Sequence, residues 1–278
     1  MRVFDTPGSV SLRIKLPSGR VVVTTVDEPQ TSVELVSLGR RGHDVLEDVS
    51  VVHDDRGDHH VVAIEQRPRF RWGPLQVSWD DALEVRVACP TGTDLELATA
   101  SASVRAEGEL GDVAVTTATG DVVLGTACGT LGVKTASGDV SVAEARGEGT
   151  LTTVSGDVRV ERCPRPLGVR SVSGDVEIET ASAPVIVATT SGDVRIERVT
   201  GGEVEVRSIS GDARIGVGPG TRVWIDAVSV SGTLESQLGL EERPPATADA
   251  DVVPLRVKTV SGDVSIVRAS ERVGAGAS

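Results

Sequence analysis

The sequence predicts an all-β protein, a parallel β-solenoid (β-helix) with turns of about 18 residues and an N-terminal β-strand cap. Three observations support this prediction. A tripeptide of Ser or Thr, Gly and Asp recurs at a nearly fixed spacing, and apolar and polar residues alternate on both sides of each copy. The chain also combines 31 Gly and 13 Pro with a valine-rich pattern, and its helix signals are weak. A period this short is typical of repeat architectures.

The repeated tripeptide ends in an aspartate, and these aspartates are the candidate site of the sequence, a structural ladder at one corner of the solenoid. The spacing is 18 residues from Asp121 to Asp193 and 19 residues to Asp212. Degenerate copies follow at 231–233 and 261–263, where the first has Thr233 in place of the aspartate. The predicted ladder consists of Asp121, Asp139, Asp157, Asp175, Asp193, Asp212 and Asp263.

Each repeat contains two short strands. The residue after the aspartate and the second one beyond that are apolar, as in Val158 and Val160, and so are the residues eight and six positions before the next aspartate, Leu167 and Val169. Such alternation predicts strands with one buried face. The residue three before the aspartate, for example Val154, breaks the alternation and indicates a corner.

One repeat buries too little apolar surface to offset the entropy of ordering it, so the repeats must stack to fold. Successive turns would lie ~4.8 Å apart, and each strand would pair in parallel with its counterpart in the next turn. A propeller is disfavoured because one blade needs roughly 40 residues. We expect residues 101–268 to form roughly eight solenoid turns.

Residues 1–100 lack the period but still alternate like strands, and we expect them to cap the first turn. Residues 9–16 and 20–26, separated by a Pro-Ser-Gly turn, predict a β-hairpin. Further strands are expected at 32–36, 49–52, 60–65, 75–79 and 83–88. Residues 237–254 are expected to loop out as a polar insertion between the last two turns, and 269–278 to form a disordered tail.

Charge and composition narrow the partners and the compartment. The net charge of −13 disfavours nucleic acid or an anionic membrane surface, since both need a basic patch. The sequence has no signal peptide and no apolar run near the ~20 residues of a membrane span, which predicts a cytoplasmic protein. An unknown protein or glycan is the expected partner, with self-association through solenoid ends or edges as a further option. We expect Cys89, Cys128 and Cys163 to be reduced.

Several segments resemble a known family. They are the opening Phe-Asp-Thr-Pro at 4–7, the Leu-Pro-Ser-Gly at 16–19 before a valine run, and the train of Ser-Gly-Asp-Val repeats. Together they resemble a large bacterial family of unknown function, common in actinobacteria, which is called "putative adhesin" and described as β-strand-repeat proteins. The resemblance implies a right-handed parallel β-solenoid without an assigned activity.

The aspartate column needs a partner, because carboxylates stacked ~4.8 Å apart repel each other. In one interpretation, each carboxylate accepts hydrogen bonds from backbone amides of its own turn, while Gly supplies a positive φ. The alternative is calcium between turns, as in the nonapeptide β-roll. One Gly and one Asp per repeat do not readily provide the six to eight oxygen ligands that calcium takes. We therefore expect neither a metal nor another cofactor.

The functional hypothesis is a non-enzymatic structural or interaction scaffold, and we assign no catalytic, cofactor-binding or metal-binding residue. The alternative is a carbohydrate-binding or polysaccharide-degrading β-helix, whose candidate residues are Arg222, Trp224 and Asp226. A turn rich in His and Asp is either solvated or a metal site. It contains His53, Asp54, Asp55, Asp58, His59 and His60.

Overall fold

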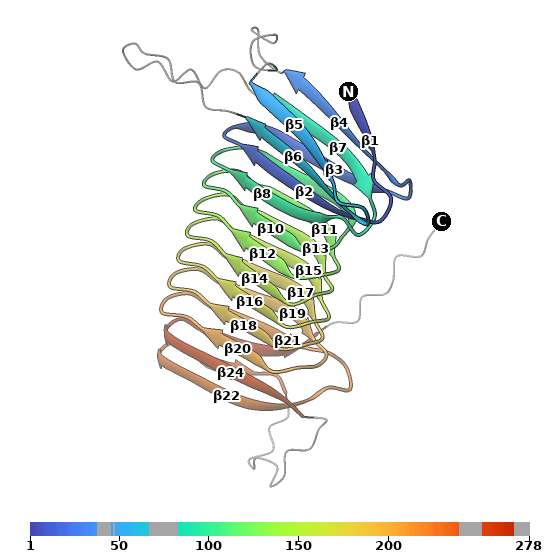
Figure 1. Cartoon of the computed structure of the whole chain (residues 1–278). Coiled ribbons are helices and arrows are strands. Elements are labelled where there is room, and N and C mark those ends of the chain that lie inside the picture. The colour runs from blue at the N-terminus through green and yellow to red at the C-terminus, as the bar shows by residue number, and fades with distance from the viewer. Residues whose placement is uncertain (38–45, 47, 67–82, 239–251, 270–278) are drawn as a thin grey trace, which may run out of the picture.

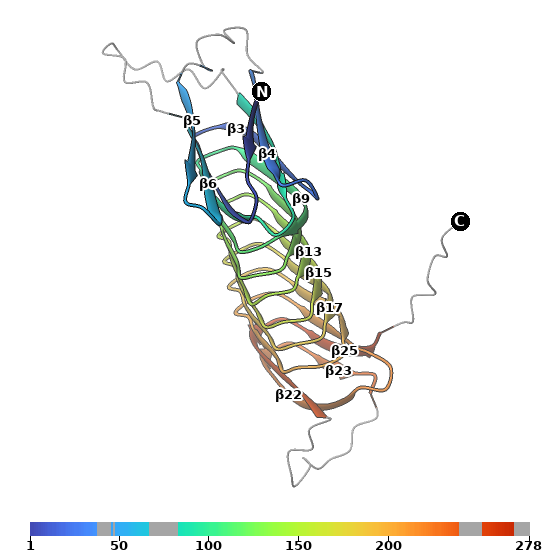
Figure 2. The same ribbon diagram turned by 45° about the vertical axis from the view of Figure 1, so that its right-hand side comes forward.

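The structure is a computed structural model that describes residues 1–37, 46, 48–66, 83–238 and 252–269. These residues contain 25 β-strands arranged in two long sheets. Figure 1 shows the strands stacked one above another along the long axis of the molecule, and Figure 2 shows the two sheets as opposite walls joined at their corners. The expectation of an all-β chain built from long parallel sheets is confirmed for these residues.

Sheet A holds 13 strands. In their spatial order they are β1 (Arg2–Asp5), β4 (Gln30–Ser37), β7 (Leu83–Pro90), β3 (Gly19–Val26), β9 (Ser103–Leu110), β11 (Val122–Ala127), β13 (Val140–Ala145), β15 (Val158–Cys163), β17 (Val176–Ala181), β19 (Val194–Val199), β21 (Ala213–Val217), β25 (Val264–Arg268) and β23 (Leu234–Ser236).

Sheet B holds 12 strands. In the same direction they are β5 (Val49–Asp55), β6 (His59–Gln66), β2 (Ser9–Leu16), β8 (Asp94–Thr99), β10 (Val113–Thr116), β12 (Leu131–Lys134), β14 (Gly149–Thr152), β16 (Leu167–Arg170), β18 (Val185–Ala188), β20 (Val204–Arg207), β24 (Val252–Ser261) and β22 (Arg222–Ser231).

Each repeat contributes one strand to each sheet, and neighbouring repeats pair in parallel. Val140 lies opposite Val122 on one side and Val158 on the other, and Leu131 lies opposite Gly149. Equivalent positions of successive repeats therefore stack in columns. The inward columns are aliphatic and fill the space between the sheets, where Leu151, for example, is fully buried.

The strands expected at 9–16 and 20–26, which are β2 and β3, do not form the predicted hairpin. β2 belongs to sheet B and pairs in parallel with β6 and β8, whereas β3 belongs to sheet A and pairs in parallel with β7 and β9. The turn between them is a corner of the stack, because Pro17 accepts hydrogen bonds from the amides of Ala100 and Ser101 in the next turn. Ser18-Gly19-Arg20-Val21 thus takes the place of a Ser-Gly-Asp-Val copy, so parallel stacking begins before residue 101.

The N-terminal end of the stack differs from its middle because its outer strands are antiparallel. β4 pairs antiparallel with both β1 and β7, and β5 pairs antiparallel with β6. The strand candidates at 32–36, 49–52, 60–65 and 83–88 fall within β4, β5, β6 and β7. The candidate at 75–79 lies outside the described residues.

At both ends the stacking order departs from the chain order. The turn β2–β3 lies between β6–β7 and β8–β9, and the turn β24–β25 lies between β20–β21 and β22–β23. The outermost turn at the C-terminal end is therefore β22–β23, although β24–β25 follows it in the sequence. Residues 252–254, which were expected in the inserted loop, begin β24, while 239–251 and 270–278 lie outside the described residues.

Candidate functional site

The aspartate column runs along the corner that leads into sheet A. From Asp139 onward, the backbone amide of each aspartate in the column donates to Oδ1 of the aspartate that precedes it in the stack. The bonds measure 3.1 Å from Asp139 to Asp121, 2.9 Å from Asp157 to Asp139 and 2.9 Å from Asp175 to Asp157. The expectation that each carboxylate accepts from its own turn is replaced by bonds that link neighbouring turns.

The C-terminal part of the column follows the stacking order and not the chain order. Asp193 and Asp212 continue the series with bonds of 2.8 Å each. The amide of Asp263 then donates to Asp212 at 2.8 Å, and the amide of Thr233 donates to Asp263 at 2.7 Å. The repulsion between stacked carboxylates is thus offset by one charge-assisted hydrogen bond at every step.

Glycine in the tripeptide is needed mainly because of a close approach between turns. A Cβ atom on Gly156 would collide with the backbone carbonyl of Gly138, and the same collision recurs along the column. A positive φ, which the sequence predicts for every copy, occurs clearly in the later turns, at +135° for Gly211 and +150° for Gly262. The glycine of the tripeptide is therefore required for close stacking in every turn, and for a positive φ only in some turns.

A column of buried hydroxyls lies behind the aspartates, four residues before each of them. In the earlier repeats the hydroxyl accepts a hydrogen bond from the glycine amide of its own corner, at 2.9 Å from Gly156 to Thr153 and from Gly174 to Ser171. The sequence pattern missed this column because Thr and Ser are not apolar. The next position along the chain carries exposed apolar side chains in several turns, among them Val154 at 49% and Val172 at 46% exposure.

A second, shorter aspartate ladder lies at the other corner, before the strands of sheet B. The amide of Asp112 donates to Asp94 at 2.8 Å, and the amide of Thr130 donates to Asp112 at 2.6 Å. Sequence reasoning overlooked it, although the two aspartates share the 18-residue spacing of the main column. Both ladders use carboxylates to satisfy backbone amides at turns.

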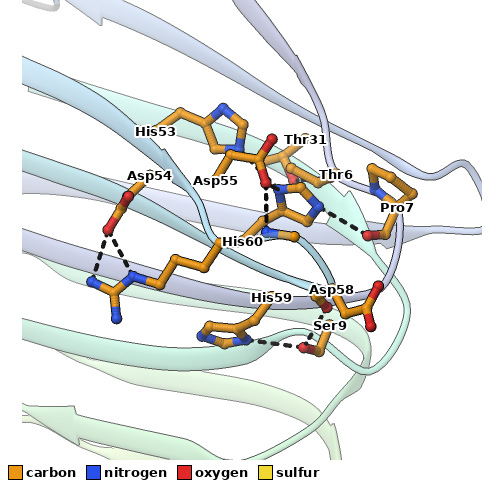
Figure 3. Close-up of polar contacts among 12 residues, drawn as sticks. Thr6, Pro7, Ser9, Thr31, His53, Asp54, Asp55, Asp58, His59 and His60 are labelled. Carbon is orange, nitrogen blue, oxygen red and sulfur yellow. Dashed lines mark hydrogen bonds and ion pairs between the residues drawn. The ribbon is translucent and has the colours of Figure 1, made fainter.

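The expected His and Asp cluster is shown in Figure 3, where its members separate into three groups. Buried His60 lies between Pro7 and Asp55. Its Nε2 donates to the Pro7 carbonyl at 2.9 Å, because a carbonyl can only accept, and its Nδ1 lies 3.2 Å from Nε2 of His53. The bond to Pro7 joins the segment between β1 and β2 to the β5–β6 hairpin.

The other members of that cluster have different partners. Asp54 forms an ion pair with Arg56 at 2.7 Å, and Nδ1 of His59 lies 2.9 Å from the Ser9 hydroxyl, which itself donates to the Asp58 carbonyl. Within the described ranges, no three side chains of His, Cys, Asp or Glu are placed to hold a metal ion together. These His and Asp side chains therefore contribute to the packing of the N-terminal end of the stack.

The candidate carbohydrate residues lie on β22, at the outer edge of sheet B. Arg222, Trp224 and Asp226 alternate along the outward face of this strand, and the guanidinium of Arg256 lies 5.8 Å from the centre of the Trp224 ring. The three candidate residues therefore lie on the same face of one strand. A separate shallow groove of about 490 Å³ crosses sheet B over small outward residues such as Gly132 and Gly168.

The cysteines are free thiols in three different settings. Cys89 and Cys163 are buried and Cys128 is exposed. Burial raises the pKa of Cys89 to about 11 and that of Cys163 to about 12, since the thiolate would lose its hydration. The two buried thiols therefore pack as small apolar side chains.

Comparison with known proteins gives one family match. Residues 12–267 match the family model described as Toastrack DUF4097. No curated protein matches the sequence. The described residues form no helix long and apolar enough to cross a membrane.

Solved structures show distant likeness over nearly the whole chain. A "putative lipid binding protein" from Parabacteroides distasonis has 11% identity and a TM-score of 0.39, covering 97% of this chain and 96% of its own. A "putative adhesin" from Parabacteroides merdae has 10% identity and a TM-score of 0.36, covering 97% and 94%. A "putative cell adhesion protein" from Clostridium sporogenes has 9% identity and a TM-score of 0.24, covering 96% and 98%.

Proposed function

The chain belongs to the Toastrack family (DUF4097), and we propose that it is a non-enzymatic interaction scaffold, adhesin-like in its use of a rigid repeat body. One observation carries the proposal. The aspartates that recur with the repeats have their Oδ1 atoms bonded to the amides of neighbouring turns. The column thus stabilises the stacking of the turns, and we assign partner binding to the broad outer faces of the two sheets.

The architecture proposed for this scaffold is a right-handed β-solenoid with 18-residue turns, in which the aspartate column is the structural ladder. The register supports the turn length, because Val122, Val140 and Val158 are successive partners. A rigid stack of this kind presents equivalent side chains at strand spacing, so a partner can make the same contact several times.

Carbohydrate binding is the second candidate function, and the groove across sheet B is the observation that favours it. Gly132 and Gly168 lie in mid-strand, and a Cβ atom on either would meet no atom closer than 3.8 Å. Packing therefore does not require glycine there. The glycines keep the groove open to an extended chain.

A glycan array and a turnover screen on polysaccharides test both candidates on the full chain. Turnover would remove the scaffold proposal. If glycans bind without turnover, Gly132→Arg and Gly168→Arg should abolish binding, whereas Ser141→Arg on the outer face of sheet A adds the same charge elsewhere and should not. Capture of a protein partner by the wild-type chain, with no glycan bound, supports the scaffold alone.

Location separates an adhesive role from an internal structural one. The cytoplasmic location expected from the sequence stays a prediction. Protease treatment of intact cells measures it, because an adhesin must be cleaved from outside while a cytoplasmic scaffold stays protected.

A further inference from the structure

The outermost turn of the C-terminal end, β22–β23, has an unpaired edge. β22 pairs with β24 and β23 pairs with β25, and no other described strand pairs with either of them. β22 is ten residues long. Unpaired edges of this length carry backbone donors and acceptors that favour the addition of another strand.

The direction of these free backbone groups follows from the rest of sheet B. Inward residues send their N–H groups toward the next turn, as when the amide of Leu167 donates to Pro184 and the amide of Val185 donates to Glu203. By the same register, the N–H groups of the inward residues Val223 and Ile225 face away from the stack. They are therefore available to a further strand.

The apolar side chains of this turn are also incompletely covered. Val223 and Ile225 are only partly buried, whereas Leu255, which lies opposite Ile225 in β24, is fully buried. Leu234 of β23 is 50% exposed, whereas Val264, its partner in β25, is 1% exposed. A strand added to this edge would bury the same columns that the stack buries elsewhere.

Among the described strands, those at the opposite end of the molecule offer no equivalent edge. β1, the edge of sheet A there, has four residues, and β5, the edge of sheet B, ends in His53, Asp54 and Asp55. Short strands and charged residues are the features by which natural proteins protect edges. One open end and one protected end lead to a closed pair of molecules, since a filament needs two complementary ends.

We propose that this end binds a second copy of the chain, with β22 pairing antiparallel to β22 of the partner. In the proposed register the strand is complementary to itself, with Arg222 opposite Asp226 of the partner subunit and Trp224 opposite Trp224 of the partner subunit. Opposite charges and aromatic pairs directly across two strands are both favourable.

This register also satisfies the backbone. Val223 lies opposite Ile225 of the partner subunit, and both are inward residues whose N–H groups face the new strand, so they form a hydrogen-bonded pair. A register centred on Asp226 would place two carboxylates opposite each other. The pairing is therefore centred on Trp224, near the beginning of β22, and the inward residues Val223 and Ile225 extend the apolar core across the junction.

Light scattering or sedimentation of the full chain over a range of concentrations measures the proposed state. We expect a species of twice the chain mass. Trp224→Glu places a carboxylate opposite its own copy and should weaken association at least tenfold, while Arg256 remains a favourable neighbour within the chain. Val228→Glu is the matched control, because it changes the charge equally on the same exposed face but lies beyond the paired residues.

A charge exchange tests the register. Asp226→Arg should weaken association, because two arginines then face each other across the strands, and adding Arg222→Asp should restore it. A chain that stays monomeric at every concentration overturns the proposal, as does equal loss in Trp224→Glu and Val228→Glu. Thermal melts of each variant show whether it is folded, and the wild-type mass tests the proposal even if a variant is not. The mass is read without any glycan or protein partner, so this result is separate from the scaffold proposal.

Discussion

At the scale of single residues, the buried hydroxyl column uses one position in two ways. In the earlier turns the hydroxyl accepts from the glycine amide of its own corner, as Thr153 does from Gly156. In the later turns the glycine amide bonds to the next turn, as when Gly192 donates to the Ser210 carbonyl at 3.1 Å. The hydroxyl of Thr189 is then buried without a hydrogen-bond partner. The same side chain thus stabilises one corner and carries an uncompensated polar atom in another.

Valine at these two positions should therefore have opposite effects. Thr153→Val leaves the Gly156 amide without its acceptor and should lower the free energy of unfolding by about 1–3 kcal/mol. Thr189→Val keeps the shape and removes an unsatisfied hydroxyl, so it should be neutral or stabilising by up to about 1 kcal/mol. Urea unfolding of both variants measures the difference. Equal destabilisation would show that the two hydroxyls have the same role.

The aspartate column permits a similar separation of charge from hydrogen bonding. Asp157→Asn keeps an oxygen that accepts from the amide of Asp175 and removes repulsion from the neighbouring carboxylates, so we expect little change in unfolding free energy. Asp157→Ala removes the acceptor and should cost about 1 kcal/mol, the low end of the usual range, because the corner is exposed and water can replace the bond.

Calcium would produce a different pattern in the same variants. A bound ion would make Asn nearly as damaging as Ala, because both substitutions remove a charged ligand. It would also raise the melting temperature on addition of calcium, since a ligand bound only by the folded state stabilises that state. We expect the melting temperature to be the same in chelator and in millimolar calcium.

At the scale of strands, the outer face of sheet A shows how charges pair between turns. Arg159 on β15 forms an ion pair with Glu177 on β17 at 3.3 Å. The outward charge at this position alternates in sign from Arg159 through Glu177 to Arg195. Arg195 on β19 lies directly opposite Arg214 on β21, so the alternation ends there. Like charges opposite each other destabilise a strand pair by roughly the amount that opposite charges stabilise it.

Neutralising one arginine in each setting should give shifts of opposite sign. Arg159→Gln should lower the unfolding free energy by about 0.2–1 kcal/mol, and Arg214→Gln should raise it by a similar amount. Each variant removes one positive charge, so the effect on net charge cancels in the comparison. At 1 M salt the difference should nearly vanish, because the screening length falls to about 3 Å. A difference that survives high salt would indicate side-chain packing as its cause.

At the scale of the whole molecule, the sequence predicts the middle of the stack far better than its ends. Strict alternation around each aspartate identifies both strands of a repeat, since a slip of one residue would expose Val158 and Val160. Three features were inaccessible or overlooked. Alternation alone does not show which turns are neighbours where the 18-residue period fails. The turn at Ser18-Gly19 resembles a hairpin turn in the sequence, because Arg20 stands where the other copies have aspartate. The hydroxyl column was missed because buried threonine reads as polar.

The same lack of information applies to the candidate site. The 18-residue spacing identifies which aspartates stack, but the partner of each carboxylate depends on the offset between turns. That offset places the Asp175 amide, and not an amide of the same corner, next to Asp157. The spacing in the sequence gives the number of residues per turn, but it does not determine how one turn is shifted relative to the next.

The stacking order at the C-terminal end links the last two turns to each other. β25 lies between β21 and β23, and β24 lies between β20 and β22. Strands β22 and β23 therefore reach the rest of the stack only through a segment that follows them in the sequence. The turn β24–β25 is thus held between two other turns and does not form the end of the stack.

Ending the chain after Leu238 should accordingly unfold two turns. Removing β24 and β25 takes away the strands with which β22 and β23 pair, and Thr233 cannot supply the carboxylate that Asp263 gives to the ladder. Hydrogen exchange measures the result directly. We expect amides of 222–236 to lose their protection in this chain, while a chain ending after Ala269 retains it. If 222–236 stayed protected in the shorter chain, β22–β23 would be docking directly on β20–β21, and the inserted turn would be dispensable for holding the end of the stack.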